Sequence, residues 1–204
     1  MPEITEGQLT FHFPTEWQAI SYDAPGSFYH TKVQRSPLDF KAVDILACSP
    51  DTCIFIEIKD CAGNEAENRP RFAGQDPAEL VETKNWIKQQ GWDSLVKAKR
   101  AKPYLPDEVA QKVVDTLTGL VASMRQADTT LANFQPGLYA QKLDIVLFLT
   151  LNHEPTTYKL LAYRLAQAIR ARLHFLKINE VIVCNEQSIP SSAAWSVTRN
   201  VAST

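Results

Sequence analysis

Long apolar runs are missing from this 204-residue chain. No run approaches the ~20 apolar residues that cross a bilayer, and the longest candidate, Ile145 to Leu151, has the length of a strand. Met1 to Thr10 is polar and acidic, without the basic start and apolar core of a signal peptide. These absences predict a soluble, cytoplasmic protein that has no membrane partner.

Cysteine is scarce, and its spacing excludes the common zinc motifs. The four cysteines are Cys48, Cys53, Cys61 and Cys184, and no two of them form a C-x-x-C pair. In a cytoplasmic protein we expect reduced, partly buried thiols. Cys48 and Cys53 flank a predicted turn, so we expect them to lie close in space.

Several motifs that define enzyme classes are also absent. The chain has no phosphate-cradling Gly-rich loop, no G-x-S-x-G elbow and no H-E-x-x-H helix, and its four histidines show no metal-ligand spacing. The formal net charge is −2 and the pI about 6.1, which argues against strong non-specific DNA binding by the whole surface. Local clusters of Lys and Arg matter more than this sum.

Two short apolar stretches, Ala42 to Cys48 and Cys53 to Ile58, predict buried β-strands joined by a tight turn. Asp44 and Glu57 interrupt these stretches, and Lys59 directly follows the second. Burying an unpaired charge costs several kcal/mol, so such residues normally pair with each other or hold a metal.

Strand geometry predicts that these three charges converge. Side chains alternate along a strand, so Glu57 and Lys59 share a face. A simple hairpin register brings Asp44 beside them on the neighbouring strand. Carboxylate oxygens in this arrangement suit Mg²⁺ or Mn²⁺, with water and a substrate phosphate in the remaining positions.

The pattern Val43-Asp44 followed by Glu57-Ile58-Lys59 resembles the PD-(D/E)XK nuclease superfamily, with Val43 in place of the proline. The resemblance implies a restriction-endonuclease-like fold and a Mg²⁺-dependent or Mn²⁺-dependent nuclease. Asp44 and Glu57 would then bind the metal, with the Ile58 carbonyl as a further ligand. Lys59 would orient or activate the attacking water. The alternative from the residues alone is an ion pair between Glu57 and Lys59, with Asp44 capping a neighbouring turn.

The first part of the chain predicts a helix and then a three-strand meander. Phe13 to Ile20 is expected as a short helix, and Ser27 to Arg35 as the strand before the central hairpin. By the resemblance, Glu16 on the first helix would be a further acid of the site. An acid in the first turn of a helix is equally explained by the helix dipole.

Cys61 to Pro106 is expected as an insertion in the core. Cys61 to Asp76 is polar and without periodicity, which predicts a mobile loop whose arginines, Arg69 and Arg71, are solvated or reach a phosphate. A helix is expected from Asp76 to about Gln90, ended by Gly91.

A basic stretch with interleaved aromatic residues follows in this insertion. Trp86 and Trp92 lie among six basic residues: Lys84, Lys88, Lys97, Lys99, Arg100 and Lys102. Such a stretch suits a nucleic-acid surface, where charge contacts phosphate and flat rings contact bases. The alternative is that both tryptophans lie in the core and the lysines are solvated.

Asp107 to Arg125 carries one apolar stripe at helical spacing, with Lys112 at its edge, where a helix packed on the sheet can point a side chain toward the site. Gln126 to Gln141 is expected as a loop. Leu143 to Leu151 predicts a buried strand, followed by a long helix to about Leu176.

Glu180 to Cys184 predicts the last buried strand, which completes a βαβ unit with parallel pairing. Arg170 belongs to a basic ridge on the preceding helix, which either faces phosphate or is simply solvated. Ala194 to Thr198 is expected as an edge strand within a frayed tail, residues 187–204.

Together these features predict a single α/β domain over residues 1–204, with a mixed central sheet flanked by helices. The leading hypothesis is a metal-dependent nuclease that acts on DNA, and a homodimer if it cuts both strands of a duplex. The first alternative is an endonuclease-like module that binds or assembles without cutting. The second is a structural protein whose charged trio is an internal ion-pair network.

Overall fold

The computed structural model describes residues 1–200 and is a mixed α/β protein with two sheets. The larger sheet has the strand order β3 (Gln18–Ser21), β4 (Ile45–Cys48), β5 (Thr52–Asp60), β6 (Lys142–Thr150) and β7 (Glu180–Cys184). Its first three strands are antiparallel, and β5, β6 and β7 run parallel. The smaller sheet is antiparallel and contains β1 (Glu3–Glu6), β2 (Leu9–His12) and β8 (Ser196–Arg199).

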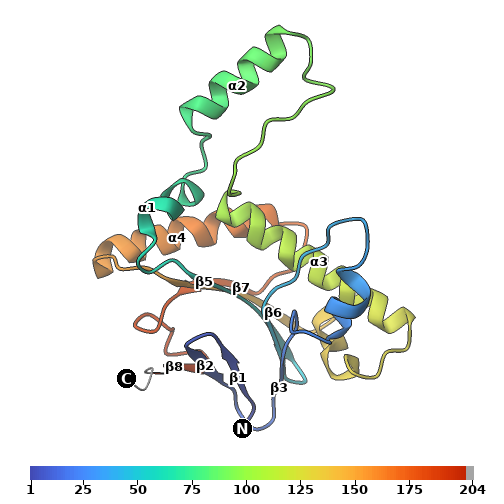
Figure 1. Cartoon of the computed structure of the whole chain (residues 1–204). Helices are drawn as coiled ribbons and strands as arrows, with labels where there is room; N and C mark the ends of the chain where they lie inside the picture. The colour runs from blue at the N-terminus through green and yellow to red at the C-terminus, as the bar shows by residue number, and fades with distance from the viewer. Residues whose placement is uncertain (201–204) are drawn as a thin grey trace.

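The two faces of the large sheet are covered differently (Figure 1). The long helices α3 (Leu105–Arg125) and α4 (Pro155–Arg172) lie on one face, and the small sheet lies against the other. Helix α1 (Glu65–Asn68) lies near the sheet edge, and α2 (Ala78–Gln89) projects away from the body. Among residues 1–200, no helix is both long and apolar enough to cross a bilayer.

Alternation along the strands builds two cores. Phe55 and Leu147 pack toward α3 and α4, whereas Ile56 and Phe148 pack toward the small sheet. Because both faces are covered, the central strands are apolar throughout rather than alternately polar. Any charged side chain on these strands is therefore placed in a largely dry environment.

Much of the predicted order is confirmed. The central hairpin, the helix that carries Lys112 and the final βαβ unit all form, and β6 and β7 pair in parallel. The predicted helix after Asp76 is also present as α2, and Gly91, at its end, has a positive φ of 69°. A left-handed residue is a common helix terminator, and glycine adopts it without a Cβ clash.

Two predictions at the N-terminal end are wrong. Phe13 to Ile20 forms no helix; this segment turns and then enters β3, while Phe13 and Trp17 pack into the core beneath the small sheet. Ser27 to Arg35 forms no strand, and its centre is a single π-helical turn, Tyr29–Val33. Tyr29 and Val33 are both buried, and their i, i+4 spacing suits a helical turn. The meander is therefore β3-β4-β5.

Four further expectations need correction. The segment from Cys61 to Asp76 contains α1 and a 3₁₀ turn, Arg69–Phe72, rather than an unstructured loop. Another 3₁₀ segment, Ala132–Leu138, lies in the second predicted loop. Within residues 1–200, the long helices lie on one face of the large sheet, and the small sheet covers the other. The expected edge strand forms as β8 (Ser196–Arg199), so the prediction of a frayed tail is wrong for these residues; its last part, residues 201–204, lies outside the described residues.

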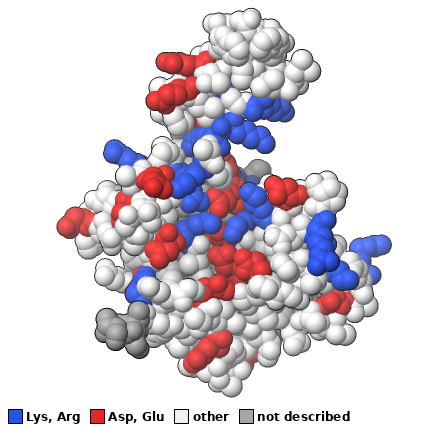
Figure 2. Space-filling model, in the orientation of Figure 1, with Lys and Arg blue, Asp and Glu red and all other residues white. Residues whose placement is uncertain are grey.

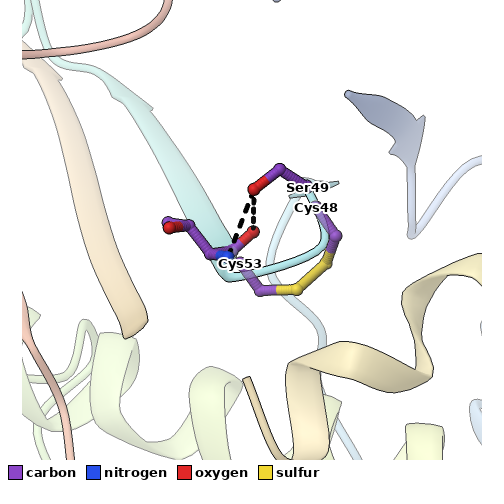
Figure 3. The surroundings of a disulfide bond; sticks show 4 residues. Cys48, Ser49 and Cys53 are labelled. Atoms are coloured by element: carbon purple, nitrogen blue, oxygen red, sulfur yellow. Dashed lines mark hydrogen bonds between the residues drawn. A yellow bond between two sulfur atoms is a disulfide. The ribbon is translucent and has the colours of Figure 1, made fainter. Parts of the chain in front are cut away.

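A disulfide joins Cys48 to Cys53 across the β4–β5 turn (Figure 3). Ser49 closes the same turn through its backbone N–H, which donates to the Thr52 carbonyl at 2.8 Å. The expectation of reduced thiols is therefore wrong for this pair, whereas Cys61 and Cys184 are free and buried. The cytoplasmic location stays a prediction.

Replacing both Cys48 and Cys53 by serine should lower the free energy of unfolding by about 2 kcal/mol, because a short loop is no longer closed in the unfolded chain. Urea unfolding checks this. Dithiothreitol should destabilise the wild type to a similar extent and leave the double variant unchanged. Thiol titration of the denatured, unreduced protein should give two free thiols; four would show that the bond does not form.

Candidate functional site

The register of the hairpin brings the predicted trio together. Ile45 pairs with Ile56, so Asp44 and Glu57 lie next to each other at the following position of the two strands. The Asp44 backbone N–H donates to the Ile56 carbonyl at 3.0 Å, and the Ile58 N–H donates to Asp44 Oδ2 at 2.5 Å. Lys59 Nζ lies 2.7 Å from Glu57 Oε1. The three side chains therefore converge as the sequence predicted.

Helix α3 adds two further charges, one helical turn apart. Lys112 Nζ lies 2.7 Å from Glu57 Oε1, 2.8 Å from Glu57 Oε2 and 3.5 Å from Asp44 Oδ1. Glu108 Oε1 lies 2.9 Å from Lys59 Nζ. Residues four apart share a helix face, so both side chains reach the same strip of the sheet. Lys112 therefore joins the site, as its place at the edge of the apolar stripe suggested.

Arg71 closes the outer end of this network. Its guanidinium donates to Glu108 Oε2 at 2.6 Å and to Asn68 Oδ1 at 3.1 Å. Arg71 is buried, so the expectation of a solvated loop arginine is wrong for it, whereas Arg69 is exposed. Three carboxylates and three cations alternate along the chain of contacts: Asp44, Lys112, Glu57, Lys59, Glu108 and Arg71.

Burial dominates the electrostatics of this network. Glu57 is fully buried; burial, with help from Asp44, raises the pKa of its carboxyl to about 7, although Lys112 and Lys59 oppose the rise. Burial disfavours the Lys59 ammonium, but Glu57 and Glu108 outweigh it and raise the pKa of Lys59 above its usual value. Burial also disfavours the Glu108 carboxylate, but Lys59 and Arg71 prevail and lower its pKa. Lys59 is therefore held as an ammonium.

Two more acids, Asp23 and Glu6, lie near Asp44, and no sequence pattern singles them out. Burial raises the pKa of Asp23 to about 6, with contributions from the neighbouring Asp44 and Glu6 carboxylates. Asp44 and Glu6 also line a cavity of about 270 Å³ together with Asp60 and Arg199. This cavity gives Asp44 contact with solvent, whereas Glu57 has none.

Glu16 does not occupy the position that the resemblance implied. It lies exposed in a turn, because the helix expected to carry it does not form. Within residues 1–200, no hydrogen bond or ion pair joins Glu16 to the trio. Asp23 and Glu6 are the acids that approach Asp44 from the N-terminal part of the chain.

The trio offers the oxygen ligands that Mg²⁺ and Mn²⁺ prefer, but lysines already contact them. No group of three or more His, Cys, Asp or Glu side chains within the described residues is arranged to hold a metal ion. The Lys112 ammonium lies between Asp44 and Glu57, where one positive charge serves both carboxylates. The donor set therefore fits a divalent cation in its chemistry, but the cation has to compete with Lys112.

The predicted nucleic-acid-binding residues divide into three groups. Lys84 and Arg100 both pair with Asp76, at 2.7 and 2.8 Å. Lys88, Lys97 and Lys99 are exposed, on α2 or on the segment that returns from it. Arg170 is exposed near the end of α4, on a different element. Figure 2 shows Lys and Arg side chains gathered where the α2 segment leaves the body, next to acidic side chains.

Comparisons with known protein families, with curated proteins and with solved structures found no match to this chain. The site is therefore interpreted from its own geometry.

The stability of the protein should depend on pH through Glu57. Its pKa falls from about 7 to its usual 4.5 on unfolding, so unfolding releases a proton between these values and Glu57 stabilises the fold less as pH rises. Relative to Glu57→Gln, the wild type should lose about 2 kcal/mol of unfolding free energy between pH 5 and 7. Urea unfolding at each pH measures this, with Glu180→Gln, at the exposed start of β7, as control. A constant difference between wild type and Glu57→Gln would contradict the raised pKa.

Proposed function

We propose that this protein is a metal-dependent nuclease that hydrolyses phosphodiester bonds of nucleic acid, with DNA as the expected substrate and a restriction-endonuclease-like core. The observation that carries the proposal is the convergence of Asp44, Glu57 and Lys59 on two adjacent strands, with Lys59 Nζ 2.7 Å from the Glu57 carboxylate. The mixed sheet, with an antiparallel meander followed by a parallel βαβ unit, supports the same assignment.

In this proposal Asp44 and Glu57 hold Mg²⁺ or Mn²⁺, and the Ile58 carbonyl is a further candidate ligand. A bound ion of this kind polarises a phosphate and lowers the pKa of a coordinated water. The contributions of the chain itself are positional and electrostatic. Lys59 is held protonated between Glu57 and Glu108, so it acts by stabilising the negative charge that develops on the phosphate rather than as a general base.

Glu108 and Arg71 support Lys59 in this role. Glu108 contacts Lys59 through one oxygen and Arg71 through the other, which fixes the carboxylate at both ends. Lys59 is thus tied to α3 as well as to its own strand. Such support limits the positions that the ammonium can adopt.

One observation favours a second candidate function, that of a binding or assembly module that does not cut. Both oxygens of Glu57 contact lysine ammonium groups, and the residue has no exposed surface. A network that is already neutral needs no metal for its stability. The metal response of the protein separates the two functions.

Lys59→Ala should reduce Mg²⁺-dependent cleavage at least 100-fold, because a charge aimed at the transition state is lost. It should leave a measurable metal-induced rise in melting temperature, because Asp44 and Glu57 remain. Glu57→Gln should lose both cleavage and the rise, whereas Glu180→Gln should lose neither. Plasmid and single-stranded substrates provide the cleavage assay, and melting with millimolar Mg²⁺ or Mn²⁺ provides the binding assay. If the wild type shows neither a metal-induced rise in melting temperature nor cleavage, the nuclease proposal is wrong and the binding or assembly module is the remaining function.

Lys112→Met should increase the apparent Mn²⁺ affinity about tenfold, because the competing ammonium beside Asp44 and Glu57 is gone. Titration of the melting temperature with Mn²⁺ at pH 8 measures this. Lys142→Met, at the exposed start of β6, is the matched control and should behave like the wild type. Equal Mn²⁺ affinity in the wild type and Lys112→Met would show that Lys112 does not compete with the ion.

A further inference from the structure

The arm, defined here as residues 78–102, carries large apolar side chains that nothing in residues 1–200 covers. It consists of α2 and the segment that returns from it, and it projects away from both sheets (Figure 1). Five of its large apolar residues are exposed: Val81, Trp86, Trp92, Leu95 and Val96. Ile87 is the single buried residue of α2. An exposed group of this kind usually marks an interaction site.

The two tryptophans of the arm are exposed and contact each other. Trp86 is 52% exposed and Trp92 is 46% exposed. Their rings meet edge to face, with centroids 5.5 Å apart and planes at 85°. These exposed fractions exclude the alternative that both tryptophans lie in the core. About half of each tryptophan is therefore accessible to a partner.

The arm is also the basic part of an acidic chain. It carries six Lys or Arg and three Asp or Glu, a net charge of +3, whereas the remaining residues carry −5. Asp76 and Glu67 pair with three of the six: Lys84, Arg100 and Lys102. Lys88, Lys97 and Lys99 have no ion-pair partner among the described residues. Their charges are available to an anionic partner.

We propose that the arm binds single-stranded nucleic acid, with bases stacked on Trp86 and Trp92 and phosphates contacted by Lys88, Lys97 and Lys99. The positive charge of the arm favours a polyanion, which carries one negative charge per phosphate, over a second copy of this chain, whose net charge is only −2. Exposed aromatic faces favour unpaired bases, because the bases of a duplex are stacked on each other and show only their edges in the grooves. The inference rests on the proposed function, since it names the form of nucleic acid delivered to the site.

The attachment of the arm connects it to the Asp44–Glu57–Lys59 site. Arg100 donates to the Ala73 carbonyl at 2.7 Å and to Asp76 Oδ1 at 2.8 Å, which connects the returning segment of the arm to the residues just before α2. The chain then enters α3 at Leu105, and Glu108 lies in the first turn of that helix. A single-stranded nucleic acid bound along the arm would therefore extend toward the N-terminal end of α3, where Glu108 contacts Lys59.

Fluorescence anisotropy with a labelled oligothymidine 20-mer and a 20-base-pair duplex tests the proposal. EDTA is present throughout, so binding is measured without hydrolysis. The variants are Trp86→Ala/Trp92→Ala, Trp86→Phe/Trp92→Phe and Lys88→Ala/Lys97→Ala/Lys99→Ala. Tyr139→Ala/Phe175→Ala is the control, because these aromatic residues are 71% and 63% exposed outside the arm. Circular dichroism melting verifies that each variant folds.

The wild type should bind the single strand at least tenfold more tightly than the duplex. The double alanine variant should lose at least tenfold in single-strand affinity, whereas the phenylalanine variant and the control should retain most of it. In the lysine variant, the negative slope of log K against log salt should become smaller in magnitude by about 2, because three phosphate contacts are lost.

Equal affinity for single strand and duplex, or no loss in the double alanine variant, would overturn the proposal. A third outcome would also overturn it: the wild type binds no single strand but forms a dimer, and the double alanine variant is a monomer. The arm would then be a contact between two copies of the chain. Binding in EDTA without Mg²⁺-dependent cleavage would reject only the nuclease proposal. Cleavage without single-strand preference would reject only the inference about the arm.

Discussion

The burial of Glu57 constrains everything around it. A carboxylate with no solvent contact, on a strand covered on both faces, requires cations within ion-pair distance, and the fold supplies Lys59 from the same strand and Lys112 from α3. Removing one partner of such a buried pair typically costs about 3–5 kcal/mol. The packing of α3 on the sheet and the position of Arg71, within the 3₁₀ turn Arg69–Phe72, are both connected to this one residue through Glu108 and Lys59.

The hydrophobic periodicity and the turn residues predicted those elements whose own sequence shows the pattern of a helix or a buried strand. These elements are the β4–β5 hairpin, α3, β6, α4 and β7. The N-terminal region was mispredicted because its structure depends on distant partners. Trp17 is buried against strands that follow it by some thirty residues, and β3 forms by pairing with β4. The small sheet joins residues near both ends of the chain, which no local period reveals.

The site shows the same division. Asp44, Glu57 and Lys59 were predictable because two charges in apolar strands require an explanation within the hairpin. Lys112 could be predicted because it is a charged residue at the edge of the apolar stripe of its helix. Glu108 is one turn before it, so the spacing E-x-x-x-K was a signal that could have been followed. The pairing of Arg71 with Glu108 and the approach of Asp23 and Glu6 to Asp44 could not be predicted, because they arise from tertiary contacts alone.

The disulfide across the hairpin turn has a consequence for the alignment of the two strands. Cys48 and Cys53 are directly paired, and Asp44 and Glu57 lie four positions further along the same ladder. A slip of one residue between β4 and β5 would turn the Asp44 side chain to the opposite face of the sheet. The disulfide prevents such a slip, because it joins the two residues that pair next to the turn. Every correctly bonded molecule is thereby committed to the one alignment in which the two carboxylates are neighbours.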